Sequence, residues 1–162
     1  MNIVMDLQLL VLLAVANGTP VIAKDIIGGR WSFPLDGGAI LPDGQPLFGA
    51  SKSIRGVVLS LLFTGLVAPL LHIGLTIGLL VAALAMIGDL CSSFLKRRLK
   101  MPASSMAIGL DQIPESLFPA IGCAFIVPLS VMDIAAVVAI FLVGEILISR
   151  VLFHFGLRDR PY

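Results

Sequence analysis

The stretch IGLTIGLLVAALAMIGDLCSSFLKRRLK, residues 73–100, decides the fold class of this chain. Residues 73–94 carry a single charge, Asp89, and this apolar run is long enough for a helix to cross a bilayer, which takes about 20 residues. Four basic residues follow it: Lys96, Arg97, Arg98 and Lys100. Asp89 therefore lies where a predicted membrane helix ends. A carboxylate there is costly unless it is solvated, paired or bound to a cation.

The whole chain has the composition of a polytopic membrane protein. Of its 162 residues, 58% are hydrophobic and 13% are charged, and the mean hydropathy is +1.05. A soluble domain has about a quarter of its residues charged. We therefore predict an all-α integral membrane protein with a single membrane domain over residues 1–162. Five segments are predicted to span the membrane: 7–23, 54–71, 73–94, 117–131 and 134–155.

The basic residues all fall on one side of this five-span topology. The 11 Lys and Arg residues lie between the first and second spans, between the third and fourth spans, or at the C-terminal end. The positive-inside rule then places the two long loops, 24–53 and 95–116, and the C-terminus in the cytoplasm. The N-terminus is predicted to lie outside the cell membrane.

The first long loop, 24–53, is rich in glycine and proline, which argues against a helix. Its segment AILPDGQPLF, residues 39–48, places a Pro-Asp-Gly turn signal between two apolar runs and predicts a small hairpin. The loop ends with Lys52 and Arg55, where the second span begins. These two residues are either a plain basic flank or part of a phosphate site, because a glycine-rich backbone and a helix N-terminus both favour phosphate binding.

The second long loop adds carboxylates to this picture. If the third helix continues through residue 100, Asp89, Ser93, Lys96 and Lys100 share one of its faces. Asp111 and Glu115 lie at the start of the fourth span. Two carboxylates on adjacent helix ends can hold Mg²⁺ together with substrate phosphates. The pattern favours phosphoryl or nucleotidyl transfer at the membrane surface.

The segments GDLCSSFLKRR (88–98) and GLDQIPE (109–115) resemble the CDP-archaeol synthase family, within the CTP-dependent phosphatidate cytidylyltransferases. The family pattern is G-D-x-x-x-S-F-x-K-R-R, a short spacer, and then D-Q-x-D. Members have five membrane helices. Further similar segments are ANGTPV (16–21), PLDGG (34–38), DGQPLFG (43–49), KSIRG (52–56) and GLRDRPY (156–162).

The resemblance implies a reaction in phospholipid biosynthesis. The phosphate of a lipid would attack the α-phosphorus of CTP, releasing pyrophosphate and forming a CDP-lipid, with Mg²⁺ as cofactor. The expected partners are CTP and a membrane lipid phosphate of the archaetidic or phosphatidic acid type, and no nucleic acid. Neither the lipid nor the oligomeric state can be read from the residues, and a homo-oligomer remains an option.

The same resemblance assigns the candidate site residues. Asp89, Asp111 and Glu115 are expected to hold the metal. Lys96, Arg97 and Asp111 are expected to be catalytic. The expected substrate-binding residues are Asn17, Lys52, Ser53, Arg55, Ser93, Lys96 and Arg97.

The chain departs from the family pattern at one position. The second Asp of D-Q-x-D is replaced by Pro114, with Glu115 next to it. Either Glu115 supplies the missing carboxylate or that carboxylate is lost. The loss would favour the alternative function, a non-catalytic or transport membrane protein derived from this family. Glu145 in the fifth span either pairs with Arg150 or lines the cavity.

Overall fold

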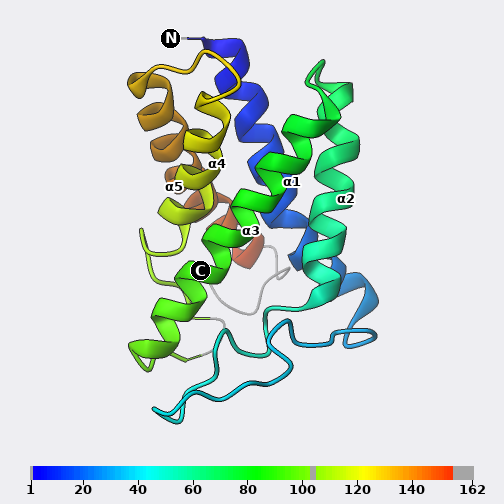
Figure 1. The fold of residues 1–162 in the computed structure, drawn as a ribbon, viewed down its shortest axis with the longest axis vertical. Coiled ribbons are helices and arrows are strands. Elements are labelled where there is room, and N and C mark those ends of the chain that lie inside the picture. Colours follow the sequence, from blue (N-terminus) through cyan, green and yellow to red (C-terminus); the bar gives the residue numbers. More distant parts are fainter. Residues whose placement is uncertain (1, 103–104, 155–162) are drawn as a thin grey trace.

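A computed structural model describes residues 2–102 and 105–154, which form one bundle of helices (Figure 1). The helices are α1 (Ile3–Ile27), α2 (Ile54–Leu70), α3 (Leu75–Arg98), α4 (Gln112–Ala124) and α5 (Val131–His154). The predicted all-α fold with five helices is confirmed. The GLRDRPY segment with Arg158 and Arg160, and the predicted end of the fifth span at residue 155, lie outside the described residues.

The helices differ in their capacity to cross a membrane. By length and apolar composition, α1, α3 and α5 are long enough to do so. The α2 helix has 17 residues and α4 has 13, so both fall short of the about 20 residues that a full span takes. The sequence predicts a fourth span over 117–131, whereas α4 begins at Gln112 and ends at Ala124.

A local cap explains why α5 begins at Val131 rather than at residue 134. The Asp133 carboxylate accepts hydrogen bonds from the backbone N–H of Ser130 (2.8 Å) and from its hydroxyl (2.6 Å). The Ser130 hydroxyl oxygen in turn accepts a bond from the Asp133 N–H at 3.2 Å. This reciprocal arrangement satisfies backbone groups that a helix start leaves unpaired, and it fixes the first turn of α5.

Small residues allow the helices to pack closely. A Cβ atom placed on Gly78 of α3 would lie 2.9 Å from the Thr64 carbonyl oxygen of α2. The Ser60 hydroxyl of α2 donates to the Ala16 carbonyl of α1 at 2.8 Å. Small and hydroxyl-bearing residues at helix contacts are typical of membrane bundles. The buried apolar core centres on α1, with Leu9, Leu12 and Leu13, and takes residues from each of the other helices, namely Ala68, Val81, Ala85, Cys123, Val137 and Phe141.

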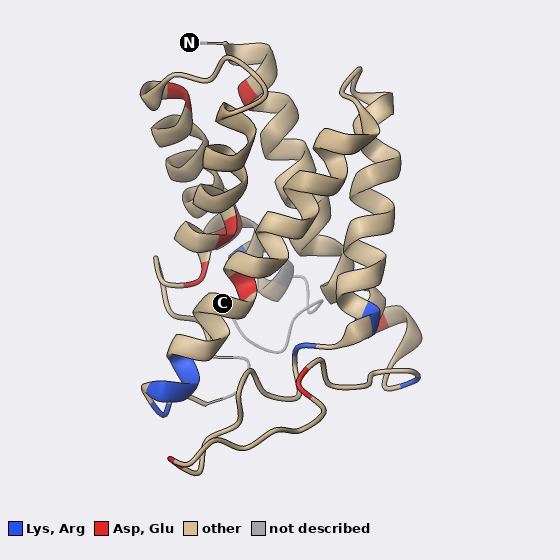
Figure 2. Cartoon of the chain, in the orientation of Figure 1, with Lys and Arg blue, Asp and Glu red and all other residues tan. Residues whose placement is uncertain are grey.

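The charges divide the bundle into two ends. Figure 2 shows Lys and Arg gathered toward the end that carries the connection between α1 and α2. The turns at the opposite end, 71–74 and 125–130, contain neither Lys nor Arg. The described part of the chain thus has the one-sided charge distribution on which the predicted topology rests.

The α1–α2 loop (28–53) has a defined shape at the basic end. The predicted hairpin is present in minimal form, as an antiparallel bridge between Ile40 and Pro46. The carboxylate of Asp36 accepts backbone N–H bonds from Gly38, Phe48 and Gly49 at 2.9–3.1 Å. Partial burial opposes ionisation of Asp36, but these three donors outweigh it and lower the pKa of the carboxyl.

Arg98, in the last turn of α3, ties this loop to the helix. Its guanidinium pairs with the Asp43 carboxylate at 2.6 Å and donates to the Pro46 carbonyl at 2.6 Å. It also lies 5.2 Å from the centre of the Phe94 ring, within the range of a cation–π contact. The loop is therefore attached at the end of α3, and its last residues bring Lys52 to Asp89 of that helix.

Candidate functional site

The site depends on a close approach of α3 and α4 at Gly88. A Cβ atom on Gly88 would overlap the Pro114 carbonyl and lie 2.7 Å from the Glu115 backbone nitrogen. Only glycine allows the two backbones to meet in this way. This contact places Asp89, the next residue of α3, beside the first turn of α4.

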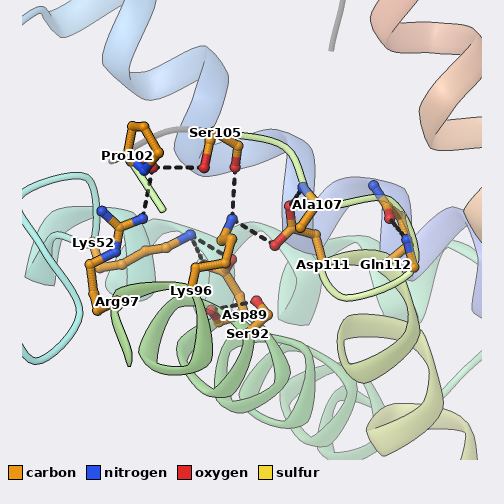
Figure 3. A network of polar contacts seen from close by, with 11 residues as sticks. Lys52, Asp89, Ser92, Lys96, Arg97, Pro102, Ser105, Ala107, Asp111 and Gln112 are labelled. Atoms are coloured by element: carbon orange, nitrogen blue, oxygen red, sulfur yellow. Dashed lines mark hydrogen bonds and ion pairs between the residues drawn. The ribbon is translucent and has the colours of Figure 1, made fainter. Parts of the chain in front are cut away.

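Asp89 is paired with Lys52, which comes from the end of the α1–α2 loop (Figure 3). The Lys52 Nζ atom lies 2.5 Å from Asp89 Oδ1 and 2.6 Å from Oδ2. Each of the two side chains is 21% exposed. Burial disfavours the ammonium, but Asp89, with smaller contributions from Glu115 and Asp111, outweighs this effect and raises the pKa of Lys52.

Glu115 adds a second carboxyl group to this centre. It is 6% exposed and lies close enough to Asp89 for the two carboxyl groups to interact. Glu145 of α5 is close enough to Glu115 for their charges to interact. Pro114 turns its carbonyl toward Gly88, while Glu115 directs a carboxyl into the bundle. These positions favour the interpretation that Glu115 takes the place of the family Asp.

A second ion pair joins α3 to the segment before α4. The Lys96 Nζ atom lies 2.6 Å from Asp111 Oδ1, and these side chains are 9% and 13% exposed. Lys96 also donates to the Ser105 carbonyl at 3.0 Å. Asp111 Oδ2 accepts the Ala107 N–H at 2.9 Å, whereas the buried Oδ1 atom has the ion pair but no aligned hydrogen-bond donor.

Four of the residues expected to bind substrate have other partners. The Asn17 amide donates to the Leu13 carbonyl of its own helix at 3.1 Å. Ser53 caps α2 by accepting the Gly56 N–H at 3.1 Å. Arg55 donates to the backbone carbonyls of Gly28 and Arg30, and Arg97 donates to that of Pro102.

The polar stripe predicted along one face of α3, from Asp89 through Ser93 and Lys96 to Lys100, is shorter than the sequence suggests. Ser93 is buried, 3% exposed, one turn beyond Asp89, and Lys96 follows it. The helix ends at Arg98, and Lys100 adopts a left-handed conformation with φ of 55°. Since Lys100 has left the helix, the stripe comprises Asp89, Ser93 and Lys96 only.

The donor set fits Mg²⁺ that also binds phosphate oxygens. Asp89 and Glu115 bring carboxyl oxygens together, and the buried Asp111 Oδ1 atom lacks an aligned donor. Among the described residues, no three His, Cys, Asp or Glu side chains form a ready-made metal site. The three carboxylates expected to hold the metal, Asp89, Asp111 and Glu115, are thus not gathered into one cluster. Mg²⁺ is usually held by one or two carboxylates while substrate phosphates and water complete its coordination, and Asp89 and Glu115 are the pair that could supply them.

Residues 67–162 match the family model described as CarS-like CDP-archaeol synthase. This chain belongs to the CDP-archaeol synthase family. A CDP-archaeol synthase of Thermofilum pendens is 32% identical over 161 residues, which cover 91% of this chain and 76% of that protein. One from Pyrobaculum islandicum is 30% identical, with 91% of this chain and 92% of that protein covered. The match to the Pyrobaculum arsenaticum synthase is 38% identical and covers 61% of this chain and 62% of that protein.

A solved structure agrees with this membership. It is described as an intramembrane enzyme for archaeal membrane lipids biosynthesis. Its sequence is 29% identical to that of the present chain, and the two structures superpose with a TM-score of 0.74. The match covers 85% of the present chain and 88% of the solved one. The chain is therefore a multi-pass membrane protein, and the family resemblance of its motifs is confirmed.

One feature of the site has no signal in the sequence. Each candidate phosphate-binding lysine is paired with a candidate metal-binding carboxylate, Lys52 with Asp89 and Lys96 with Asp111. Lys52 and Asp89 are 37 residues apart and belong to different elements. No local spacing rule could have predicted which carboxylate each ammonium faces.

Proposed function

We propose that this chain is a cytidylyltransferase that converts CTP and archaetidic acid to CDP-archaeol and pyrophosphate. The observation that carries this proposal is the pair of ammonium–carboxylate contacts, Lys52–Asp89 and Lys96–Asp111, with Glu115 beside them. They lie between a loop and two helices of a membrane bundle, where a polar nucleotide and a lipid head group can meet. The similar proteins named above are CDP-archaeol synthases, which favours archaetidic acid over phosphatidic acid.

Lys52 and Lys96 are the residues we assign to the triphosphate. An ammonium group on a flexible stem is a mobile point charge that can follow phosphate oxygens. Arg97 is 5% exposed and its Nε atom has no hydrogen-bond partner, so a donor remains for a phosphate next to Lys96. Asn17, Ser53, Arg55 and Ser93 stay candidates for contacts that form when the nucleotide binds.

Asp89 and Glu115 would hold Mg²⁺, which would neutralise charge on the triphosphate and on the leaving pyrophosphate. Asp111 is not gathered with them into one metal cluster and pairs with Lys96 instead. The lipid phosphate is largely ionised near neutral pH, so no residue has to remove a proton from it. Its oxygen forms a bond to the α-phosphorus of CTP while the bond from that phosphorus to the β-phosphate oxygen breaks. Lys52 and Lys96 stabilise the charge that shifts onto pyrophosphate.

The orientation of the chain is part of the proposal. CTP is a cytoplasmic solute, and Lys52, Lys96 and Arg97 belong to the end of the α1–α2 loop and to the last turn of α3, at the end of the bundle where Lys and Arg gather (Figure 2). The α1–α2 loop, the connection between α3 and α4, and the C-terminus would then face the cytoplasm, in accord with the positive-inside rule. The N-terminus would lie outside.

The alternative of a non-catalytic or transport protein rested on the carboxylate lost at Pro114. Glu115 is buried beside Asp89, so the replacement of the family Asp by Pro114 no longer favours a non-catalytic protein.

The deciding assay is pyrophosphate release by the purified protein in detergent with CTP and Mg²⁺. We expect turnover with unsaturated archaetidic acid, little with phosphatidic acid, and none from Asp89→Asn. Turnover absent with every lipid phosphate would contradict the proposal.

A further inference from the structure

Both oxygens of Asp89 are engaged by one ammonium group. Lys52 Nζ lies 2.5 Å from Oδ1 and 2.6 Å from Oδ2, so a positive charge lies against both of the oxygens that would bind a metal. A divalent cation that approaches Asp89 alone meets Lys52 at close range. Repulsion between like charges is strong in a partly desolvated site.

The second pair repeats this arrangement. Lys96 occupies Asp111 Oδ1 at 2.6 Å and is itself 7% exposed. A nucleotide that arrives without a metal meets the opposite problem, because its triphosphate would lie next to Asp89, Asp111 and Glu115. Each free ligand must therefore separate a pair and leave one buried charge without a partner, which is costly.

The metal–nucleotide complex avoids this cost. The carboxylates can pass to the metal while the ammonium groups pass to the triphosphate, so every buried charge keeps a partner. Lys52 follows a turn in which its N–H bonds to the Gly49 carbonyl at 3.1 Å. Its long side chain can swing from Asp89 to a phosphate without a change in this backbone.

We propose that Lys52 is a specificity-determining residue that admits a divalent cation to Asp89 only together with a nucleotide triphosphate. This inference rests on the proposed function for the identity of the nucleotide. Mg²⁺ and CTP should bind with positive coupling, each raising the affinity for the other by about tenfold or more.

The test is calorimetric binding to the full chain in detergent, with Mg²⁺ alone, CTP alone in a chelator, and both together. Wild-type protein should bind Mg²⁺ weakly until CTP is present. Lys52→Met should bind Mg²⁺ alone about tenfold more tightly or better, since the Asp89 carboxylate then has no ammonium partner, and should bind the CTP complex more weakly. Lys52→Arg should keep the wild-type pattern, and Lys24→Met, at an exposed lysine outside the site, is the matched control.

A second readout covers the risk that Lys52→Met is unstable. Mg²⁺ without nucleotide should raise the melting temperature of Lys52→Met more than that of the wild-type protein, because a ligand stabilises the state that it binds. Equal Mg²⁺ affinity and equal melting shifts in the two proteins would overturn the inference. The arm with Mg²⁺ alone contains no CTP, so it tests Lys52 even if cytidylyl transfer itself were disproved. Conversely, turnover with independent binding of Mg²⁺ and CTP would overturn only the inference.

Discussion

At the scale of single residues, the site rests on charges placed against each other in a bundle that is otherwise apolar. Glu115 is the most informative, because it stands one position after Pro114, where the family pattern has Asp. Its carboxyl is buried beside Asp89. A carboxyl group kept inside a membrane bundle is a functional candidate by default, and this one shares its surroundings with Lys52.

Glu115→Gln is expected to lower the rate of pyrophosphate release by about 100-fold or more, because the substitution keeps the shape and replaces one metal-binding carboxyl oxygen with an amide nitrogen. The loss should be partly reversed at high Mg²⁺ concentration. Asp43→Asn is the matched control, since Asp43 is a carboxylate that pairs with Arg98 at the loop surface. Rates within a few-fold of each other for the two variants would remove Glu115 from the metal site.

At the scale of helices, α3 and α4 position the carboxylates, and their contact depends on glycine. The Gly88 backbone meets the backbone of Pro114 and Glu115. The α4 helix is short, and its first turn lies inside the bundle, with Gln112 wholly buried and its side-chain oxygen bonded to the Gly109 N–H at 2.8 Å. The register of these two helices therefore sets the distance between Asp89 and Glu115.

Gly88→Ala should push the two helices apart and destabilise the protein by about 1–3 kcal/mol, as overpacking does elsewhere. It should also reduce turnover, because Asp89 and Glu115 separate. The control is Gly144→Ala in α5, where a Cβ atom meets nothing within 4 Å, and where alanine is expected to stabilise the helix slightly. Thermal unfolding in detergent measures the stability of both variants, and pyrophosphate release measures their turnover. Equal melting temperatures for the two variants would show that the Gly88 contact does not constrain the helices.

At the scale of the whole molecule, the bundle has one basic end that carries the site and one end whose turns lack basic residues. Exposed apolar side chains such as Leu62, Leu66 and Leu70 cover the outside of α2, as a lipid-facing surface requires. The proposed reaction requires that a lipid phosphate head group and a soluble nucleotide both reach the candidate site, and a position at the basic end of a membrane bundle suits this requirement.

The predicted orientation can be tested with single cysteines in a Cys91→Ser, Cys123→Ser background. Asp43→Cys, in the α1–α2 loop, should react with a membrane-impermeant maleimide only from the cytoplasmic side. Met132→Cys, exposed at the opposite end, should react only from outside. The reverse pattern in sealed vesicles would contradict the orientation and would separate the site from cytoplasmic CTP.

The amino-acid sequence was sufficient to predict the class of this protein and most of the polar residues of its candidate site. The apolar run at 73–94 and the few charges predicted membrane helices, because bilayer length and backbone hydrogen bonding leave little choice. The motifs around Asp89, Lys96 and Asp111 indicated the family, and the Pro-Asp-Gly signal predicted the hairpin at Ile40 and Pro46, which the structure has as a single bridge. These are local features, so neighbouring residues suffice to specify them.

Only the tertiary structure decided how these residues are combined. The pairing of Lys52 with Asp89 depends on where the end of the α1–α2 loop meets α3. The position of Glu115 depends on how closely α3 and α4 approach at Gly88. The early start of α4 likewise depends on non-local packing. The departure of Lys100 from the α3 stripe depends on where α3 ends. The physical reason is that an ion pair is set by distance in space, and distance between remote segments follows from helix packing rather than from spacing along the chain.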